Sequence, residues 1–204
     1  MRKFLLVSAL LCVVGPFVAS IDAVDPIDTK LLTEPAVSAS HIAFTYSGDL
    51  FVADRSGANV RRLTTDEGNE SNPVFSPDGK TIAFSASYDG NVDVFTVPVT
   101  GGAPVRLTWH PGADAVQAFT PDGKAILFTS QRASYTNRYF QLFTVPVGGG
   151  MSEQLPIPNA ASAAFSPDGG RIAYNPIPPR FQQWKAYRGG TASEIWLYNR
   201  KDHA

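Results

Sequence analysis

Short apolar runs of strand length alternate with turn-forming residues along most of this chain. The clearest pattern is a decapeptide that occurs three times, with offsets of 44 and 46 residues, at residues 75–84 (FSPDGKTIAF), 119–128 (FTPDGKAILF) and 165–174 (FSPDGGRIAY). Each copy predicts a strand, a turn and a second strand, because Pro presets φ, Asp caps the turn and Gly accepts a positive φ. A period of this length is typical of one β-propeller blade.

The rest of each blade aligns on these copies. A second apolar run follows each decapeptide and predicts a third strand, at residues 92–99, 141–147 and 194–198. In the first two of these blades a Gly-rich turn leads into a short outer strand, at residues 106–108 and 154–156. A degenerate earlier copy predicts strands at residues 41–44, 49–53 and 62–64. The fold class is therefore all-β, a β-propeller of four-stranded antiparallel blades with about four blades present, roughly residues 31–64, 65–108, 109–156 and 157–204.

Residues 31–33 (LLT) resemble an outer strand that has no blade of its own. In a propeller such a strand completes the last blade and hides two sheet edges. Two interpretations follow. Either the ring closes at four blades, with residues 31–33 supplying the missing outer strand of the fourth, or the chain is the front part of a longer propeller. Alone, such an open propeller exposes an apolar blade face and an unpaired edge.

The N-terminus has the pattern of a signal peptide. Arg2 and Lys3 precede an apolar run that ends in small residues near Ser20. We therefore expect a signal peptide at residues 1–20, a short linker at residues 21–30 and a periplasmic or secreted protein with no membrane attachment after cleavage. A membrane anchor is the competing interpretation, but the run is short and contains Gly15-Pro16. The one cysteine, Cys12, lies within the run, so the mature chain has no thiol chemistry.

Charge and motifs limit the possible chemistry. Without Arg2 and Lys3 the 17 basic residues fall to 15 against 18 acidic ones, a net charge of about −3, which argues against nucleic acid as a partner. None of the common nucleotide-binding or hydrolase motifs occurs. His41, His110 and His203 are interpreted as structural. We predict no catalytic residue, metal site or cofactor in this chain.

The repeated Pro-Asp-Gly carboxylates raise the question of metal binding. Their repetition is explained better by the turn, in which Asp completes local hydrogen bonds. The predicted structural turn residues are Asp78, Gly79, Asp122, Gly123, Asp168 and Gly169.

The segment 176–191 (PIPPRFQQWKAYRGGT) breaks the repeat and lengthens the link between two strands of the fourth blade. Aromatic and basic side chains on such an insertion are typical of a recognition surface. The candidate residues for substrate or partner binding are Arg180, Phe181, Trp184, Lys185, Tyr187 and Arg188. The alternative is that this loop packs on a neighbouring blade or domain.

One family is similar in this loop and elsewhere. Residues 184–191 (WKAYRGGT), followed by residues 194–198 (EIWLY), resemble a segment in the N-terminal propeller of tricorn proteases and their bacterial homologues. The opening is similar too, at residues 31–35, 41–44 and 48–52. The Pro-Asp-Gly repeats are less specific, because periplasmic TolB-like propellers and relatives of prolyl oligopeptidase share them.

The resemblance implies a large serine peptidase in which a six-bladed propeller comes first and the catalytic core lies far downstream. It implies that this propeller filters or orients peptides, and that its partners are peptides, or a protein, and the downstream domains of the same polypeptide. A homo-oligomer is also possible. None of the family's catalytic residues maps onto this chain. The alternatives are an exported TolB-like scaffold for protein interactions and, third, a small propeller lyase or hydrolase.

Overall fold

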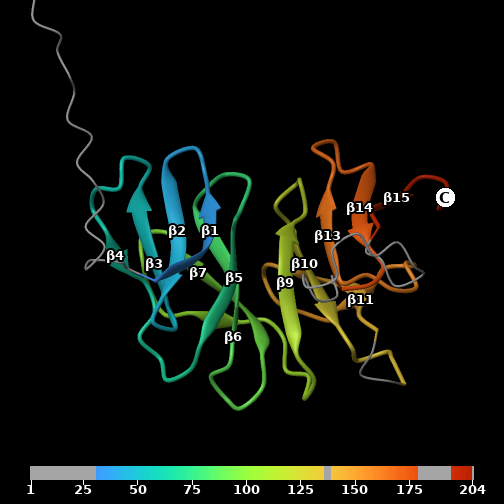
Figure 1. The fold of residues 1–204 in the computed structure, drawn as a ribbon, viewed down its shortest axis with the longest axis horizontal. Coiled ribbons are helices and arrows are strands. Elements are labelled where there is room, and N and C mark those ends of the chain that lie inside the picture. Colours follow the sequence, from blue (N-terminus) through green and yellow to red (C-terminus); the bar gives the residue numbers. More distant parts are fainter. Residues whose placement is uncertain (1–30, 136–138, 179–193, 204) are drawn as a thin grey trace, which may run out of the picture. The chain divides into compact units, whose positions relative to one another are not determined.

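The computed structural model describes residues 31–135, 139–178 and 194–203. Their regular structure consists of strands in four antiparallel sheets, and no helix occurs among them, so none that could cross a membrane. The sheets follow one another along the chain (Figure 1). The prediction of an all-β chain built of antiparallel propeller blades is confirmed.

Every sheet has its strands in chain order. The first contains β1 (Leu32–Val37), β2 (His41–Tyr46), β3 (Asp49–Asp54) and β4 (Arg61–Arg62). The second contains β5 (Glu70–Phe75), β6 (Thr81–Ala86), β7 (Asp93–Pro98) and β8 (Val105–Arg106). The third contains β9 (Asp114–Phe119), β10 (Ala125–Ser130), β11 (Gln141–Pro146) and β12 (Glu153–Gln154). The fourth contains β13 (Ser162–Phe165), β14 (Arg171–Asn175) and β15 (Trp196–Asn199).

The prediction that residues 31–33 form an outer strand is wrong. They lead into β1, the first strand of the first sheet, in which Thr33 pairs with Thr45 and Ala36 with Ala43. The local sequence misled the prediction because this blade has no Pro-Asp-Gly turn. Ser38 makes the connection instead, since its hydroxyl bonds the carbonyl of His41 at 3.2 Å. Because β1 belongs to the first sheet, it does not supply an outer strand to the fourth.

The first strands of successive sheets, β1, β5, β9 and β13, lie next to one another and are called the inner strands below (Figure 1). A hydrophobic cluster fills each space between neighbouring sheets. In each cluster the later sheet contributes large residues from its middle strands, and the earlier sheet contributes mostly smaller ones. Phe84 and Phe95, stacked at 5.8 Å, pack in this way against Leu50 and Val52. Each sheet therefore covers one face of the sheet before it.

The fourth sheet has a face that no described residue covers. Leu50, Val94 and Leu142 occupy equivalent places in the first three sheets and are fully buried. In the fourth sheet the equivalent residue, Ile195, is 76% exposed, and nearby Leu197 is 64% exposed. The equivalent face is therefore buried in the first three sheets and exposed in the fourth.

Candidate functional site

The loop residues singled out from the sequence lie outside the described residues. These are Arg180, Phe181, Trp184, Lys185, Tyr187 and Arg188. Their role in substrate or partner binding stays a prediction. The described residues offer three other polar features: the Pro-Asp-Gly turns, the junctions between sheets, and the inner strands.

Each Pro-Asp-Gly turn is held by the same hydrogen bonds. In the first, the Ser76 hydroxyl donates to Asp78 Oδ1 at 2.6 Å, and the backbone N–H of Lys80 donates to the same oxygen at 3.1 Å. The other turns repeat this geometry through Thr120 and Asp122, and through Ser166 and Asp168. Hydrogen bonds from these hydroxyls are the main reason why the pKa of each of the three carboxyl groups lies below 3.8. Hydrogen bonds from the backbone N–H groups lower the pKa further.

The glycines of these turns need a conformation that other residues rarely adopt. Gly79, Gly123 and Gly169 have φ of 68°, 70° and 70°. Each turn also sits close to the previous blade, since a Cβ on Gly123 would lie 3.6 Å from Pro77 Cδ. The carboxylates thus act in turn closure, and no group of three potential metal ligands is found in the described part of the chain.

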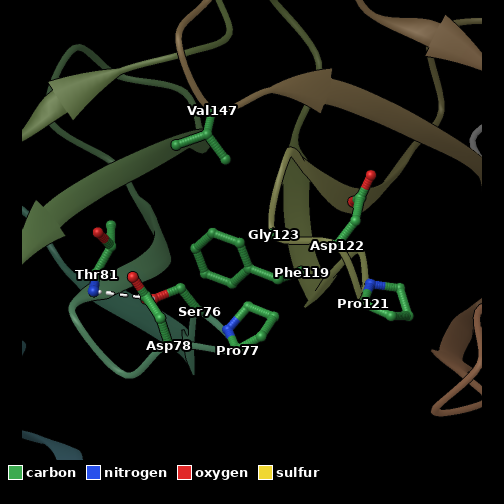
Figure 2. A pocket seen from close by; sticks show the side chains of 9 residues that line it. All are labelled: Ser76, Pro77, Asp78, Thr81, Phe119, Pro121, Asp122, Gly123 and Val147. Atoms are coloured by element: carbon green, nitrogen blue, oxygen red, sulfur yellow. Dashed lines mark hydrogen bonds between the residues drawn. The ribbon is translucent and has the colours of Figure 1, made fainter.

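A cavity of about 240 Å³ lies between the turns of the second and third blades (Figure 2). Its lining includes Phe119, Val147 and the rings of Pro77 and Pro121, with Asp78 and Asp122 beside them. The cavity combines an apolar surface with two carboxylates whose oxygens already serve the turns. The structure therefore assigns it no chemistry beyond turn packing.

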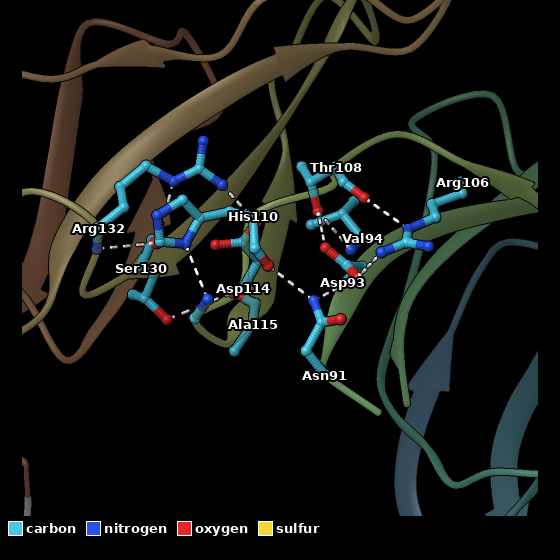
Figure 3. A network of polar contacts seen from close by, with 12 residues as sticks. Asn91, Asp93, Val94, Arg106, Thr108, His110, Asp114, Ala115, Ser130 and Arg132 are labelled. Carbon is cyan, nitrogen blue, oxygen red and sulfur yellow. Dashed lines mark hydrogen bonds and ion pairs between the residues drawn. The ribbon is translucent and has the colours of Figure 1, made fainter. Parts of the chain in front are cut away.

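A polar network lies at the junction of the second and third blades (Figure 3). Asp93, which is 1% exposed, accepts from Arg106 Nη2 at 2.5 Å and from the Thr108 hydroxyl at 3.0 Å. The Thr108 hydroxyl also accepts from the backbone N–H of Val94 at 3.0 Å. Arg106 Nε donates to the Thr108 carbonyl at 2.8 Å. This closed set of hydrogen bonds ties β7 to the segment that follows β8.

A second buried carboxylate, Asp114, lies at the first residue of β9. It is paired with Arg132, whose guanidinium also lies 5.1 Å from the ring centres of Phe128 and Phe143. Burial raises the pKa of Asp114, opposed by Ser130 and by the charge of Arg132. One oxygen, Oδ1, has no hydrogen-bond partner among the described residues. The pair stabilises the start of this inner strand.

The first junction repeats this arrangement 44 residues earlier. Arg62 Nη2 donates to Asp49 Oδ1 at 2.6 Å, and the Thr64 hydroxyl accepts from the backbone N–H of Leu50 at 2.9 Å. Glu70, at the first residue of β5, takes the place of Asp114 and accepts from the Tyr88 hydroxyl at 2.6 Å. The third junction has Gln141, Gln154 and Pro156 instead. The network therefore belongs to the first two junctions.

The histidines have local partners. Nδ1 of His41 lies 2.8 Å from the Ser40 hydroxyl, and Nδ1 of His110 accepts from the N–H of Gly112 at 2.9 Å. Nδ1 of His203 lies 2.5 Å from the Tyr198 hydroxyl. Each contact is within the same turn or between close neighbours in sequence.

The inner strands form a groove of about 310 Å³ that crosses the first three blades. It lies where the pairing of each strand shifts register, at a β-bulge. Glu34 and Asn72 occupy these bulges in β1 and β5, and each has a φ of 52°, which is unusual for residues other than Gly. The lining consists of Glu34, Pro35, Asn72, Pro73, Val74, Val116 and Gln117.

Comparison with known proteins identifies the family. Residues 29–204 match the tricorn protease N-terminal β-propeller domain. The chain belongs to this family. It is 31% identical over 161 residues to tricorn protease homolog 1 of Streptomyces coelicolor, and the match covers 79% of this chain but 15% of that relative.

Solved structures agree with a tricorn N-terminal propeller. A crystal structure of the tricorn protease superposes with a TM-score of 0.66 at 25% identity, covering 83% of this chain and 17% of that one. A putative TolB from Agrobacterium tumefaciens gives a TM-score of 0.66 at 21% identity, covering 83% of this chain and 58% of that one. The likeness to TolB shows the fold alone. The described part of this tricorn propeller spans a small fraction of its peptidase relatives.

Sequence reasoning missed the junction network and the inner groove of this tricorn propeller. A signal for the network is present, because an Asp before the third strand, an Arg-Leu-Thr outer strand and a following acidic residue recur after 44 residues. The prediction assigned these residues to strands and gave their polar side chains no role. The groove has no comparable signal, since its lining comes from three blades.

Proposed function

We propose that this chain is a noncatalytic propeller portion of a tricorn-like serine peptidase, and that it filters or orients peptides for a catalytic domain of the same polypeptide. The observation that carries the proposal is the family match over residues 29–204. The small share of the curated relative that the chain covers, 15%, supports a role as one part of a larger enzyme.

Two structural features support the proposal. The groove across the inner strands combines proline rings with a carboxylate and side-chain amides, groups that contact peptides well. The uncovered apolar face of the fourth sheet fits a further blade, because equivalent faces of the first three sheets are each covered by the next sheet. We therefore propose that the complete ring has more blades, six by resemblance to the family.

We further propose that the protein is exported to the periplasm or secreted. The support is the pattern of residues 1–20, with Arg2 and Lys3 before an apolar run. These residues lie outside the described part of the chain. Cell fractionation of the tagged protein tests this proposal directly.

The first experiment is to sequence the locus beyond the codon for Ala204. We expect the reading frame to continue into further blades and a peptidase core. A stop codon directly after Ala204 would overturn the assignment to a peptidase.

The second experiment tests peptide handling in the full-length product. Pro35→Trp places a large side chain at an exposed position of the groove. We expect kcat/KM to fall about tenfold for peptides of about ten residues and to stay unchanged for dipeptide-sized substrates. Val60→Trp, at an exposed position outside the groove, is the matched control. Equal effects of both variants on both substrates would contradict a filtering role.

The alternative function is an exported TolB-like scaffold for protein interactions. It is supported by the likeness in fold to the TolB of Agrobacterium tumefaciens and by the shared Pro-Asp-Gly turns. This alternative predicts that the reading frame ends soon after the ring closes.

A further inference from the structure

The inner strands of this propeller carry only negative charge. Their ionisable residues are Glu34 in β1, Glu70 in β5 and Asp114 in β9, and none of the four strands contains Lys, Arg or His. Glu70 and Asp114 are buried and bonded to Tyr88 and Arg132. Glu34 is the exposed carboxylate of the described inner strands.

Glu34 is held at the groove by the neighbouring blade. Its Oε2 accepts a hydrogen bond from the backbone N–H of Asn72. Both residues are non-glycine residues with a left-handed φ, and each is followed by a proline that also lines the groove. The bond fixes the carboxylate between two blades, and its other oxygen, Oε1, has no hydrogen bond to a described residue.

The groove has two further polar side chains, one that is hydrogen-bonded within the protein and one that is exposed. The Gln117 amide is engaged, because its oxygen accepts from the N–H of Ala163 at 3.2 Å and its nitrogen lies 3.4 Å from Thr129 Oγ1. The Asn72 side chain is exposed. An incoming ligand therefore meets one carboxylate, one amide and the exposed ring of Pro35, with the buried Pro73 beside them.

We propose that this groove binds an ammonium group of a peptide, with Glu34 as the counter-charge and the Asn72 amide as a hydrogen-bond partner. The proposal rests on the proposed role in peptide handling and names the chemistry that this site recognises. A carboxylate on inner strands that contain no basic residues attracts cations and repels anionic groups. The ammonium belongs either to the peptide's N-terminus or to a lysine side chain, and the experiment separates these sources.

The test is peptide binding to the mature chain at low salt, measured by isothermal titration calorimetry. The probes are penta-alanine with a free N-terminus, N-acetyl-penta-alanine, and N-acetyl-penta-alanine with its central residue replaced by lysine. We expect the free peptide to bind about fivefold more tightly than the acetylated one, as for a partly exposed ion pair. Added salt is expected to reduce this difference.

Glu34→Gln removes the charge but keeps an oxygen that can accept from the Asn72 N–H. We expect the free and acetylated peptides to bind this variant equally. Glu67→Gln removes an exposed carboxylate outside the groove and is the matched control, which we expect to keep the fivefold difference. Unchanged thermal unfolding of both variants shows that they are folded.

The outcomes separate this inference from the function on which it rests. Equal binding of free and acetylated penta-alanine to the wild-type chain would overturn the ammonium site and leave peptide handling intact. Absence of binding by all three peptides would overturn both. Binding of the lysine peptide that depends on Glu34 identifies a side-chain ammonium as a ligand, and binding of the free peptide alone identifies the N-terminus.

Discussion

Glu70 and Asp114 occupy equivalent places, at the first residues of β5 and β9, and both are almost fully buried. Asp114 has Arg132 as an ionic partner, whereas Glu70 has the neutral Tyr88 hydroxyl. Burial raises the pKa of Glu70, assisted by the charge of Asp49, and the Tyr88 hydrogen bond opposes it. One oxygen of Glu70 has no hydrogen-bond partner among the described residues. The folded chain therefore favours the protonated form of Glu70 more than the unfolded chain does.

The raised pKa predicts how stability changes with pH. The contribution of Glu70 is fully present below its unfolded pKa of 4.5 and is lost as pH rises through the higher folded pKa. We expect the free energy of unfolding to fall as pH rises above 4.5, and Glu70→Gln to make this fall smaller. Urea unfolding followed by tryptophan fluorescence at several pH values measures both.

The control for this prediction is Glu67→Gln, which removes an exposed carboxylate three residues earlier. It should keep the slope of the wild-type chain. The turn carboxylates do not interfere in this range, because their lowered pKa means that their contribution is lost only as pH falls below 3.8. Identical slopes for Glu70→Gln and wild type would show that Glu70 is ionised in the folded chain at these pH values.

The outer strands β4 and β8 are two residues long. Side-chain hydrogen bonds add to the few backbone bonds that attach them to the third strands. Thr64 and Thr108 follow these strands and accept hydrogen bonds from the third strands of their own blades. Both threonines are buried, at 1% and 3% exposure. In the third blade Pro156 takes this place and has no hydroxyl. A threonine hydroxyl therefore helps to secure the outer edge of each of the first two blades.

This arrangement predicts the effect of removing the hydroxyls. Thr64→Val and Thr108→Val keep the shape of the side chain but leave the N–H groups of Leu50 and Val94 without these partners. We expect each substitution to lower the free energy of unfolding by about 1–3 kcal/mol, the usual cost of a buried unsatisfied polar group. Chemical denaturation measures the loss.

Thr65→Val is the matched control, because Thr65 is adjacent to Thr64 and exposed. It should change stability by no more than about 0.5 kcal/mol. An equal loss in Thr65→Val and Thr64→Val would mean that β-propensity, and not the buried hydrogen bond, causes the effect.

The described sheets end in two faces that other sheets cover elsewhere in the molecule. On the first sheet Phe44 and Phe51 stack at 5.8 Å, like the pairs that pack on a preceding sheet in later blades. On the fourth sheet Ile195 and Leu197 are exposed. The large residues on the first sheet and the smaller residues on the fourth are of the same kinds as those that pack together between successive sheets.

These faces predict that the isolated mature chain self-associates. Burial of a side chain such as Leu197 stabilises a complex by about 1.5–3 kcal/mol. An exposed apolar surface of this kind therefore favours association. We expect Leu197→Lys to shift the chain toward the monomer in sedimentation velocity experiments. Val60→Lys, which changes an exposed residue outside the sheet faces, should not. A monomeric wild-type chain that melts cooperatively would contradict this prediction.

The short-range features of this protein could be predicted from its sequence. The Pro-Asp-Gly turns depend on residues within five positions of one another, such as Ser76 and Thr81, so the sequence by itself determined them. The blade period and the strand order within each blade followed from the repeat. The family resemblance followed from residues 184–191 and the opening segment.

Tertiary structure alone decided the features that join different blades. The place of β1 depended on its pairing with β2, because its Leu-Thr sequence resembles an outer strand. The position of Glu34 depends on Asn72, 38 residues away, and that of Gln117 on Ala163, 46 residues away. The burial of Glu70 likewise depends on Tyr88 and on neighbouring blades. Such contacts have no local sequence signal, because their partners become neighbours only when the blades stack.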